Sequence, residues 1–257
     1  MWPPSLALDL VHSLDPVAFA EDRLGFAPDR WQAGLLRSRR RQVILNCSRQ
    51  SGKSTAAAIL ALHTALYTPE SLVLLVSPSL RQSKELFGKV TGFLKGLEPT
   101  EVLEEDNRLS CALANRSRIV SLPGDQKTIR GFSGPALIVE DEAARVMDET
   151  HTAVRPMLAV SQGQLVLMST PNGKIGHFYE IWREGGQDWE RIELPATQCP
   201  RISPEFLEQE KRVMGPLLFE QEYCGVFHDS AMNVFSGDLI QAALVDYFTP
   251  FLEMALA

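Results

Sequence analysis

Apolar runs and helix-like spacing alternate along most of this sequence. Six short apolar runs bounded by polar or turn-forming residues predict strands at Gln42–Cys47, Leu72–Ser77, Ile119–Leu122, Ala136–Glu140, Gln164–Ser169 and Trp189–Leu194. Helix-like spacing predicts helices after Lys53, after Ser79 and around Met147–Ala159. Because the runs at 72–76 and 137–139 are apolar on both faces of a strand, helices must cover both faces of the sheet. The pattern predicts a doubly wound α/β fold with a mostly parallel sheet flanked by helices.

The pattern changes at both ends of the chain. Residues 1–30 combine helical spacing with prolines and a glycine, and predict a helical lead-in that turns into a helix near Trp31. From Pro195 onward the segments are short and helical, with Glu205–Met214 the clearest. We therefore expect a core domain at residues 31–200 and a small helical linker or lid region at 201–257.

Composition excludes several classes of protein. With 45% hydrophobic and 22% charged residues in a chain of 257, the sequence has the composition of a globular domain and not of a disordered, collagen-like or coiled-coil protein. No apolar run approaches the length of a membrane-spanning helix, so we expect no membrane partner. The four cysteines form no C-x-x-C pair, which argues against a zinc ribbon or a disulfide scaffold.

The net charge of −7 requires any contact with nucleic acid to be local. One candidate is the window from Arg37 to Lys53, where six basic residues occur without an acidic one. The alternative is a solvated basic face beside a phosphate site.

The strongest chemical signal lies between the first predicted strand and its helix. Backbone N–H groups of such a loop and the helix N-terminus can cradle phosphates, while Lys53 bridges the β- and γ-phosphates and Ser54 reaches Mg²⁺. The G-x-x-x-x-G-K-S pattern departs at its first position, where Cys47 replaces glycine. A glycine-marked turn with an exposed lysine is the alternative. The candidate nucleotide-binding residues are Cys47, Ser48, Arg49, Gln50, Ser51, Gly52, Lys53, Ser54 and Thr55.

Three carboxylates follow the fourth predicted strand. At the end of a parallel strand Asp141 is placed to hold Mg²⁺ together with Ser54, and Glu142 could polarise the attacking water. The role of Glu140 stays open, and a charged loop capping the next helix is the alternative for all three. The next strand ends in Ser169 and Thr170, whose hydroxyls would lie near the γ-phosphate unless they belong to an ordinary turn.

The combination of these motifs resembles the large terminase subunits of tailed bacteriophages and prophages. The core R-Q-S-G-K-S of Arg49–Ser54, with no glycine at the loop start, is similar to their variant Walker A motif. Other matching segments are Trp31-Gln32 as the adenine-side Q motif, Ile138–Ala143 as Walker B, Ser169–Pro171 as the coupling motif, Thr128–Gly131 and Phe219–Tyr223. The resemblance spans roughly residues 28 to 237 and rests on the order and spacing of all of them.

The resemblance implies a P-loop NTPase of the RecA/ASCE-like type, with ATP and Mg²⁺ as cofactors. It implies an ATP-hydrolysing motor that translocates double-stranded viral DNA into a capsid through the portal, with the core at 31–200 as its ATPase domain. Its implied partners are double-stranded DNA, the portal protein, the small terminase subunit and further copies in a homo-oligomeric ring, pentameric in the family. Its implied location is the host cytoplasm, transiently at the procapsid portal.

The resemblance also assigns roles to single residues. Gln32 would contact adenine, and Lys53 and Glu142 would act in catalysis. Arg130 lies on a glycine-flanked segment before Walker B, where it could complete the site of a neighbouring subunit in a head-to-tail ring. A surface cation, or an ion pair with Glu140, is the alternative for Arg130.

Large terminases also carry an RNase H-like nuclease domain, which we expect to be absent from this chain. Two other functions remain open at this point. A helicase-like DNA repair ATPase would share most of the motifs but would need a second RecA-like domain. A catalytically idle nucleotide-binding assembly subunit would fit the replacement at Cys47, but the presence of Lys53, Ser54, Asp141 and Glu142 argues against it.

Overall fold

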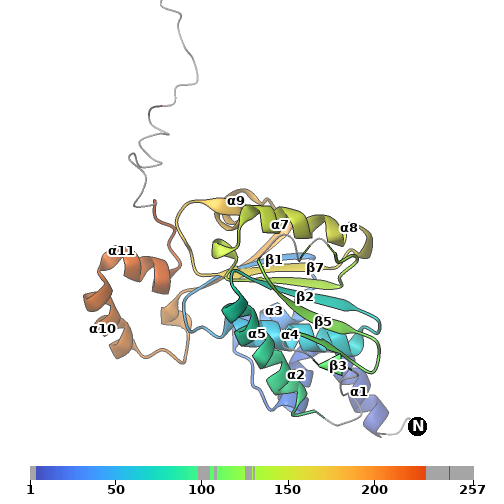
Figure 1. The fold of residues 1–257 in the computed structure, drawn as a ribbon. Coiled ribbons are helices and arrows are strands. Elements are labelled where there is room, and N and C mark those ends of the chain that lie inside the picture. The colour runs from blue at the N-terminus through green and yellow to red at the C-terminus, as the bar shows by residue number, and fades with distance from the viewer. Residues whose placement is uncertain are drawn as a thin grey trace, which may run out of the picture.

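An eight-stranded sheet forms the centre of the molecule in the computed structural model, which describes residues 4–97, 105–106, 109–124, 129, 131–229 and 243. The strands lie in the order β3-β4-β5-β2-β6-β7-β1-β8, and all pairings from β5 to β8 are parallel (Figure 1). The strands are β1 (Gln42–Cys47), β2 (Leu72–Ser77), β3 (Glu105–Asp106), β4 (Ser110–Ala112), β5 (Arg118–Pro123), β6 (Leu137–Asp141), β7 (Gln164–Ser169) and β8 (Trp189–Leu194).

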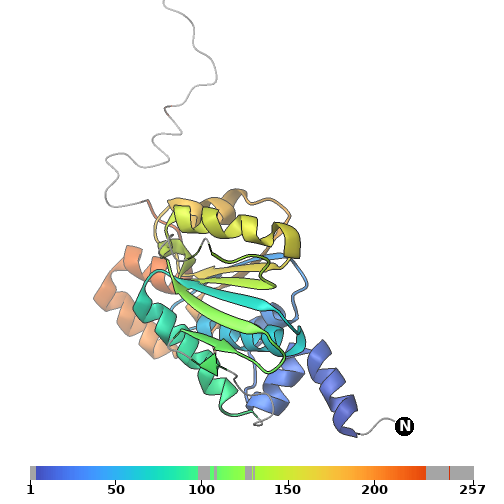
Figure 2. The same ribbon diagram turned by 45° about the vertical axis from the view of Figure 1, so that its right-hand side comes forward.

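Helices cover both faces of this sheet. They are α1 (Pro4–Leu14), α2 (Pro16–Leu24), α3 (Arg30–Arg37), α4 (Lys53–Tyr67), α5 (Leu80–Leu94), α7 (Asp148–Val154), α8 (Leu158–Ser161), α9 (Gly176–Glu184), α10 (Pro204–Met214) and α11 (Pro216–Phe219). One buried core joins α2 to α5 to one face, and a second joins α7 and α9 to the other (Figure 2). No helix in the described part of the chain has the length and apolarity to cross a membrane.

The alternation of side chains along β6 divides its residues between the two cores. Leu137 and Val139 belong to the core under α4, whereas Ile138 belongs to the core under α7 and α9. Because successive strand residues point to opposite faces, Glu140 and Asp141 leave the strand on opposite sides. The two neighbouring carboxylates therefore belong to different environments.

The predicted α/β class and mostly parallel sheet are confirmed. Four predicted strands have the observed limits, and the other two differ by one residue at each end. The single helix expected around Met147–Ala159 is wrong: α7 ends at Val154, a 3₁₀ turn follows at Arg155–Met157, and α8 is separate. Pro156 lies in that turn and cannot donate the backbone hydrogen bond that a continuous helix would need. The short antiparallel strands β3 and β4 and helix α9 were not predicted.

Residues 196–229, which we call the C-terminal helical region, carry a small core of their own. It consists of Ala196, Leu207, Phe219 and Tyr223, with three partly buried neighbours. The segment contains α10, α11 and a π-helical turn at Glu220–Cys224, and α10 and α11 lie to one side of the sheet in Figure 1. Its contacts with the P-loop are hydrogen bonds: Asn46 Nδ2 donates to the Gly225 carbonyl over 2.7 Å, and Arg49 N–H donates to the Glu222 carbonyl over 3.0 Å.

Candidate active site

Three neighbouring strands bring the predicted site residues together at one edge of the sheet. Strands β6, β7 and β1 are adjacent and parallel, so their carboxyl ends lie side by side. The P-loop follows β1, Asp141 and Glu142 stand at the end of β6, and Ser169 and Thr170 stand at the end of β7. Ligands of open parallel sheets bind at this edge.

Lys53 lies inside the P-loop. Its ammonium donates to the carbonyls of Cys47 over 3.3 Å and Ser48 over 3.1 Å, and the residue is buried. Burial raises the pKa of the Cys47 thiol to about 12, so this side chain is a neutral packing group. The backbone bond from Ser48 N–H to the Leu194 carbonyl ties the loop start to β8. The fifteen-residue helix α4 begins at Lys53 and aims its N-terminal N–H groups at the loop.

Gly52 is required by the local packing of this loop. Its φ is +89°, and an added Cβ would lie 2.9 Å from Gln32 Nε2 and 3.1 Å from Arg201 Nη2. The Gln32 amide donates to the Gly52 carbonyl over 3.3 Å and accepts from Asp29 N–H over 2.9 Å. Arg201 donates to the Ser51 carbonyl and pairs with Asp29. Gln32 thus fixes the P-loop, and the structure does not test its predicted contact with adenine.

Ser54 and Asp141 form the oxygen pair expected of a magnesium site. The Ser54 hydroxyl donates to Asp141 Oδ2 over 3.0 Å. Burial, with a smaller contribution from the nearby Glu142 charge, raises the pKa of Asp141 to about 6. The hydroxyls of Ser48, Ser51 and Ser169 are buried without a hydrogen-bond partner among the described residues. Carboxylate and hydroxyl oxygens suit Mg²⁺, and orphaned hydroxyls suit a phosphate.

Asp141→Asn is expected to stabilise the nucleotide-free fold above pH 6. The folded-state pKa of Asp141 exceeds its unfolded value, so its ionisation lowers stability as pH rises from about 4 to about 6. Asparagine lacks this effect and should raise the free energy of unfolding by about 1–3 kcal/mol at pH 8, with no gain at pH 4. Denaturant titration without Mg²⁺ measures this, with the exposed Asp188→Asn as the control. A loss of stability at pH 8 would contradict the assignment.

Glu142 leaves β6 in a left-handed conformation. Its φ and ψ are 53° and 43°, a region that non-glycine residues seldom occupy and that is found at functional sites. Its N–H donates to Asp141 Oδ1 over 3.0 Å, and its carbonyl accepts from Arg145 N–H over 2.8 Å in the turn Ala143–Arg145. This geometry directs the Glu142 carboxylate away from the metal pair, which suits a group that acts on water.

Two arginines connect the carboxylates around the site. Arg145 Nη1 lies 3.1 Å from Glu142 Oε2 and donates to Thr170 Oγ1 over 3.2 Å. Arg145 Nη2 lies 3.5 Å from Glu222 Oε1, and Arg49 Nε lies 3.4 Å from Glu222 Oε2. The P-loop, the ends of β6 and β7, and the C-terminal helical region thus meet in one polar network.

Glu140 belongs to a separate buried cluster behind the site. Its carboxylate lies 2.9 Å from His151 Nδ1 and 3.1 Å from His177 Nε2, and His177 Nδ1 lies 2.8 Å from Asp148. Burial by itself would raise the pKa of Glu140, but the hydrogen bonds and charges of the two histidines hold it at about 2. Burial opposes protonation of His177, yet its two carboxylate partners raise its pKa above the ordinary value. Glu140 therefore anchors the end of β6 to α7 and α9.

The same cluster has the composition of a metal site but not its geometry. Ligand atoms of Glu140, His151 and His177 lie within 4.8 Å of one another. The two imidazole rings, however, are stacked, with centroids 4.2 Å apart and planes 10° from parallel. Since a ring nitrogen's lone pair lies in its ring plane, lone pairs in two stacked planes do not converge on one ion. We interpret the cluster as an ion-pair network.

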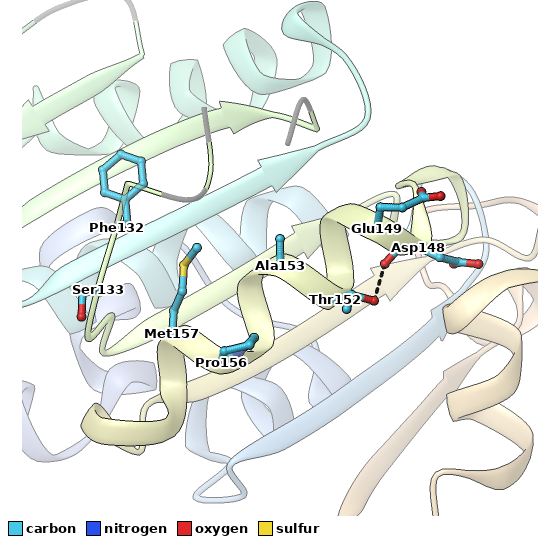
Figure 3. Close-up of a pocket in the computed structure, with 8 residues that line it drawn as sticks. All are labelled: Phe132, Ser133, Asp148, Glu149, Thr152, Ala153, Pro156 and Met157. Atoms are coloured by element: carbon cyan, nitrogen blue, oxygen red, sulfur yellow. Dashed lines mark hydrogen bonds between the residues drawn. The ribbon is translucent and has the colours of Figure 1, made fainter. Parts of the chain in front are cut away.

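A pocket of about 770 Å³ lies elsewhere on the molecule, between residues 132–133 and α7 (Figure 3). Asp148, Glu149, Thr152 and Met157 are among the residues that line it, and none of its lining residues belongs to the P-loop or to the end of β6. Its charged groups are acidic, which disfavours a phosphate. The pocket is not part of the nucleotide site.

The remaining predicted residues lie in or beside the loop, with one exception. Gln50 has a φ of 59° at the loop tip, and the Thr55 hydroxyl accepts from Lys89 over 3.2 Å. Arg130 lies outside the described residues, so its role stays a prediction. Sequence reasoning missed Arg145 and Arg201. It marked the segment containing Glu222 by resemblance without giving that residue a role.

Comparison with known proteins identifies the family. Residues 44–242 match the family described as terminase large subunit, T4likevirus-type, N-terminal. The chain belongs to the large terminase family. The large terminase subunits of Thermus phage G20c and Thermus virus P23-45 are each 28% identical over 250 residues, covering 83% of this chain and 51% of the relative. The chain thus spans about half the length of the curated large terminases it matches.

Solved structures support the fold of a large terminase ATPase domain. The ATPase domain of the large terminase of Thermus phage P74-26 superposes with a TM-score of 0.75 at 24% identity, covering 83% of this chain and 99% of that one. The HK97 large terminase gives 0.69 at 15% identity, covering 84% and 55%. The large terminase of a thermophilic bacteriophage, solved in complex with ADP, gives 0.64 at 12% identity, covering 84% and 52%.

Proposed function

We propose that this chain binds ATP with Mg²⁺ and hydrolyses it, as the motor domain of a phage DNA-packaging machine. The observation that carries the proposal is the meeting of the P-loop, the Ser54–Asp141 pair and Glu142 at the carboxyl edge of one parallel sheet. The family match and the ADP complex of the thermophilic phage terminase support a nucleotide as the ligand. They do not favour a helicase-like or idle subunit.

Each residue has a distinct part in this proposal. Lys53 exchanges its carbonyl partners for β- and γ-phosphate oxygens, and the N-terminus of α4 adds N–H donors. Ser54 and Asp141 would hold Mg²⁺, which when bound neutralises charge on the phosphates. Glu142 accepts the proton of the attacking water, and its carboxylate stands at the site rim, partly open to solvent.

Lys53→Ala is the direct test of the nucleotide site. The variant should lose at least about 100-fold in affinity for Mg-ATP, because no other ammonium lies within the described loop to meet the phosphates. Titration with a fluorescent ATP analogue measures the affinity, and phosphate release measures turnover. Lys89→Ala, on α5 beside Thr55, is the matched control and should bind like wild type. Wild-type chain that binds no Mg-ATP would refute the proposal.

The family match supports DNA and packaging-machinery partners at a general level. Within this proposal the chain acts on double-stranded DNA in a ring of copies at the portal, together with the small terminase subunit. Arg39, Arg40 and Arg41 are exposed at the start of β1, at the edge opposite the P-loop. The basic window is therefore divided, since Arg37 pairs with Asp15 and Lys53 lies within the P-loop. The exposed arginines offer a few phosphate contacts per subunit.

Binding of DNA by the isolated chain should be weak and strongly salt-dependent. The double variant Arg40→Glu/Arg41→Glu should make the slope of log affinity against log salt shallower by about 1–2, since each lost phosphate contact removes about one counterion. Fluorescence anisotropy with a labelled duplex over a salt series measures this. Arg81→Glu/Arg116→Glu, at exposed positions elsewhere, is the control. Tight, salt-insensitive binding by a monomer would contradict the prediction.

Arg130 completes the proposal as an arginine donated to the neighbouring subunit of the ring. It precedes β6 on a segment next to Gly131. An arginine in such a position stabilises charge on the γ-phosphate in the transition state. This role applies to the assembled ring alone.

A further inference from the structure

Arg145 joins the end of β6 to two other parts of the site. Its guanidinium contacts Glu142 over 3.1 Å, Thr170 over 3.2 Å and Glu222 over 3.5 Å. These partners come from the end of β6, the end of β7 and the π-helical turn of the C-terminal helical region. The Arg145 side chain is about one-third exposed, so solvent screens these contacts only in part.

The contacts of Arg145 restrict the orientation of the Glu142 carboxylate. Glu142 stands beyond the strand, and its long side chain is 28% exposed, so packing alone leaves its carboxylate free to rotate on the solvent side. Arg145 is itself fixed, because its N–H donates to the Glu142 carbonyl and its planar guanidinium has a defined set of donor directions. It engages Oε2 of Glu142 and leaves Oε1 available to accept from water.

Glu222 links Arg145 to the P-loop. Its side chain is 8% exposed, and one oxygen faces Arg145 while the other faces Arg49. The charges alternate in the order Arg49, Glu222, Arg145, Glu142, so each carboxylate touches a guanidinium. Without Arg145, the two carboxylates would lose the cation between them, and Glu142 would lose the group that orients it.

We propose that Arg145 is a positioning residue for ATP hydrolysis, which orients Glu142 through one arm of its guanidinium and is itself oriented by Thr170 and Glu222. This inference rests on the proposed ATPase function. It connects the coupling segment at the end of β7 and the C-terminal helical region to the base without placing either in contact with the reacting atoms. Arg145 acts through Glu142 and not on the nucleotide.

Steady-state kinetics of Arg145→Gln test this role. We expect kcat to fall about 10- to 100-fold, a part of the ~10²- to 10⁴-fold that a positioned base supplies. The KM for ATP and the affinity of the fluorescent ATP analogue should stay within about twofold of wild type, because the phosphate-binding groups are intact. Arg145→Lys should recover part of kcat, since an ammonium can still contact Glu142. Arg81→Gln, an exposed arginine paired with Glu85, is the matched control and should match wild type.

A second variant separates positioning from folding. Glu222→Gln should lower kcat less than Arg145→Gln does, and the double variant should be no slower than Arg145→Gln alone by more than about twofold, because both changes disturb one network. The urea midpoint of each variant at pH 7 reports folding independently of turnover. The inference would be overturned by wild-type kcat in Arg145→Gln, by equal losses in kcat and ATP affinity, or by no recovery in Arg145→Lys.

Failure of the proposed function would look different. If wild-type chain neither binds nor hydrolyses Mg-ATP, the ATPase proposal fails regardless of Arg145. The coupling between Arg145 and Glu222 is then tested by a double-mutant cycle on the free energy of unfolding, which needs no nucleotide. Additive effects in that cycle would show that the two residues do not interact and would overturn the inference; a coupling of the expected sign supports the network.

Discussion

Glu142→Gln should abolish nearly all ATP turnover while preserving ATP binding. The amide has the shape of the carboxylate and can still accept a hydrogen bond from Arg145, but it cannot take a proton from water. A positioned general base supplies about 10²- to 10⁴-fold, so kcat should fall by that amount. The affinity for Mg-ATP should change by less than about threefold, since Lys53, Ser54 and Asp141 are untouched.

Single-turnover phosphate release and binding of a fluorescent ATP analogue give the two readouts. Glu220→Gln is a suitable control, because Glu220 pairs with His228 on the C-terminal helical region. Hydrolysis at the wild-type rate by Glu142→Gln would show that another group acts as the base.

Glu140→Gln should unfold far more easily than wild type, although Glu140 precedes Asp141 in the chain and lies outside the nucleotide site. Glu140 is fully buried, and its substitution leaves the buried histidines without their carboxylate. Removing one partner of a buried ion pair costs about 3–5 kcal/mol, a large share of the ~5–15 kcal/mol of a typical domain. Denaturant titration at pH 5.5, followed by tryptophan fluorescence, measures the loss.

The pH dependence of this loss distinguishes a charge pair from simple packing. Glu140 has a lowered pKa of about 2, so its contribution is present above its unfolded value near 4.5 and disappears as pH falls toward 2. His177 has a raised pKa, so its contribution is present below its ordinary value of 6.5 and is lost as pH rises through the folded value. The difference between wild type and Glu140→Gln should therefore be larger at pH 5.5 than at pH 9. Glu85→Gln, an exposed glutamate, should show neither effect. A loss of equal size at both pH values would indicate packing alone.

Much of the site could be predicted from the sequence because its signals are local. The P-loop is a continuous segment between a strand and a helix, and Asp141 and Glu142 end an apolar run, so the parallel sheet brings them to one edge. Alternation along β6 also explains why Asp141 meets Ser54 while Glu140 meets His151. The two-residue period of a strand is enough to assign these adjacent carboxylates to opposite faces of the sheet.

The missed residues depend on contacts between distant segments. Arg145 follows Glu142 closely, but its role appears only when Thr170 and Glu222 are placed beside it, and Glu222 is 77 positions away. Arg201 reaches Ser51 across 150 positions. His151 and His177 carry no motif, and α9, which holds His177, begins after turn-forming residues that weaken its helical pattern. No periodicity encodes such pairings.

The separate core of the C-terminal helical region has a mechanical consequence. Because that core shares no buried residue with either core of the sheet, the region could tilt as a lever while all three cores stay packed. Tilting would break polar contacts such as Asn46 with Gly225 and Arg49 with Glu222, and water can replace their partners. Net hydrogen-bond strengths of about 0.5–1.5 kcal/mol make the stiffness of this joint small. Exchange of one ligand phosphate contact at the P-loop is on the same scale, so the chemistry at the sheet edge and the angle of the lever are matched in energy.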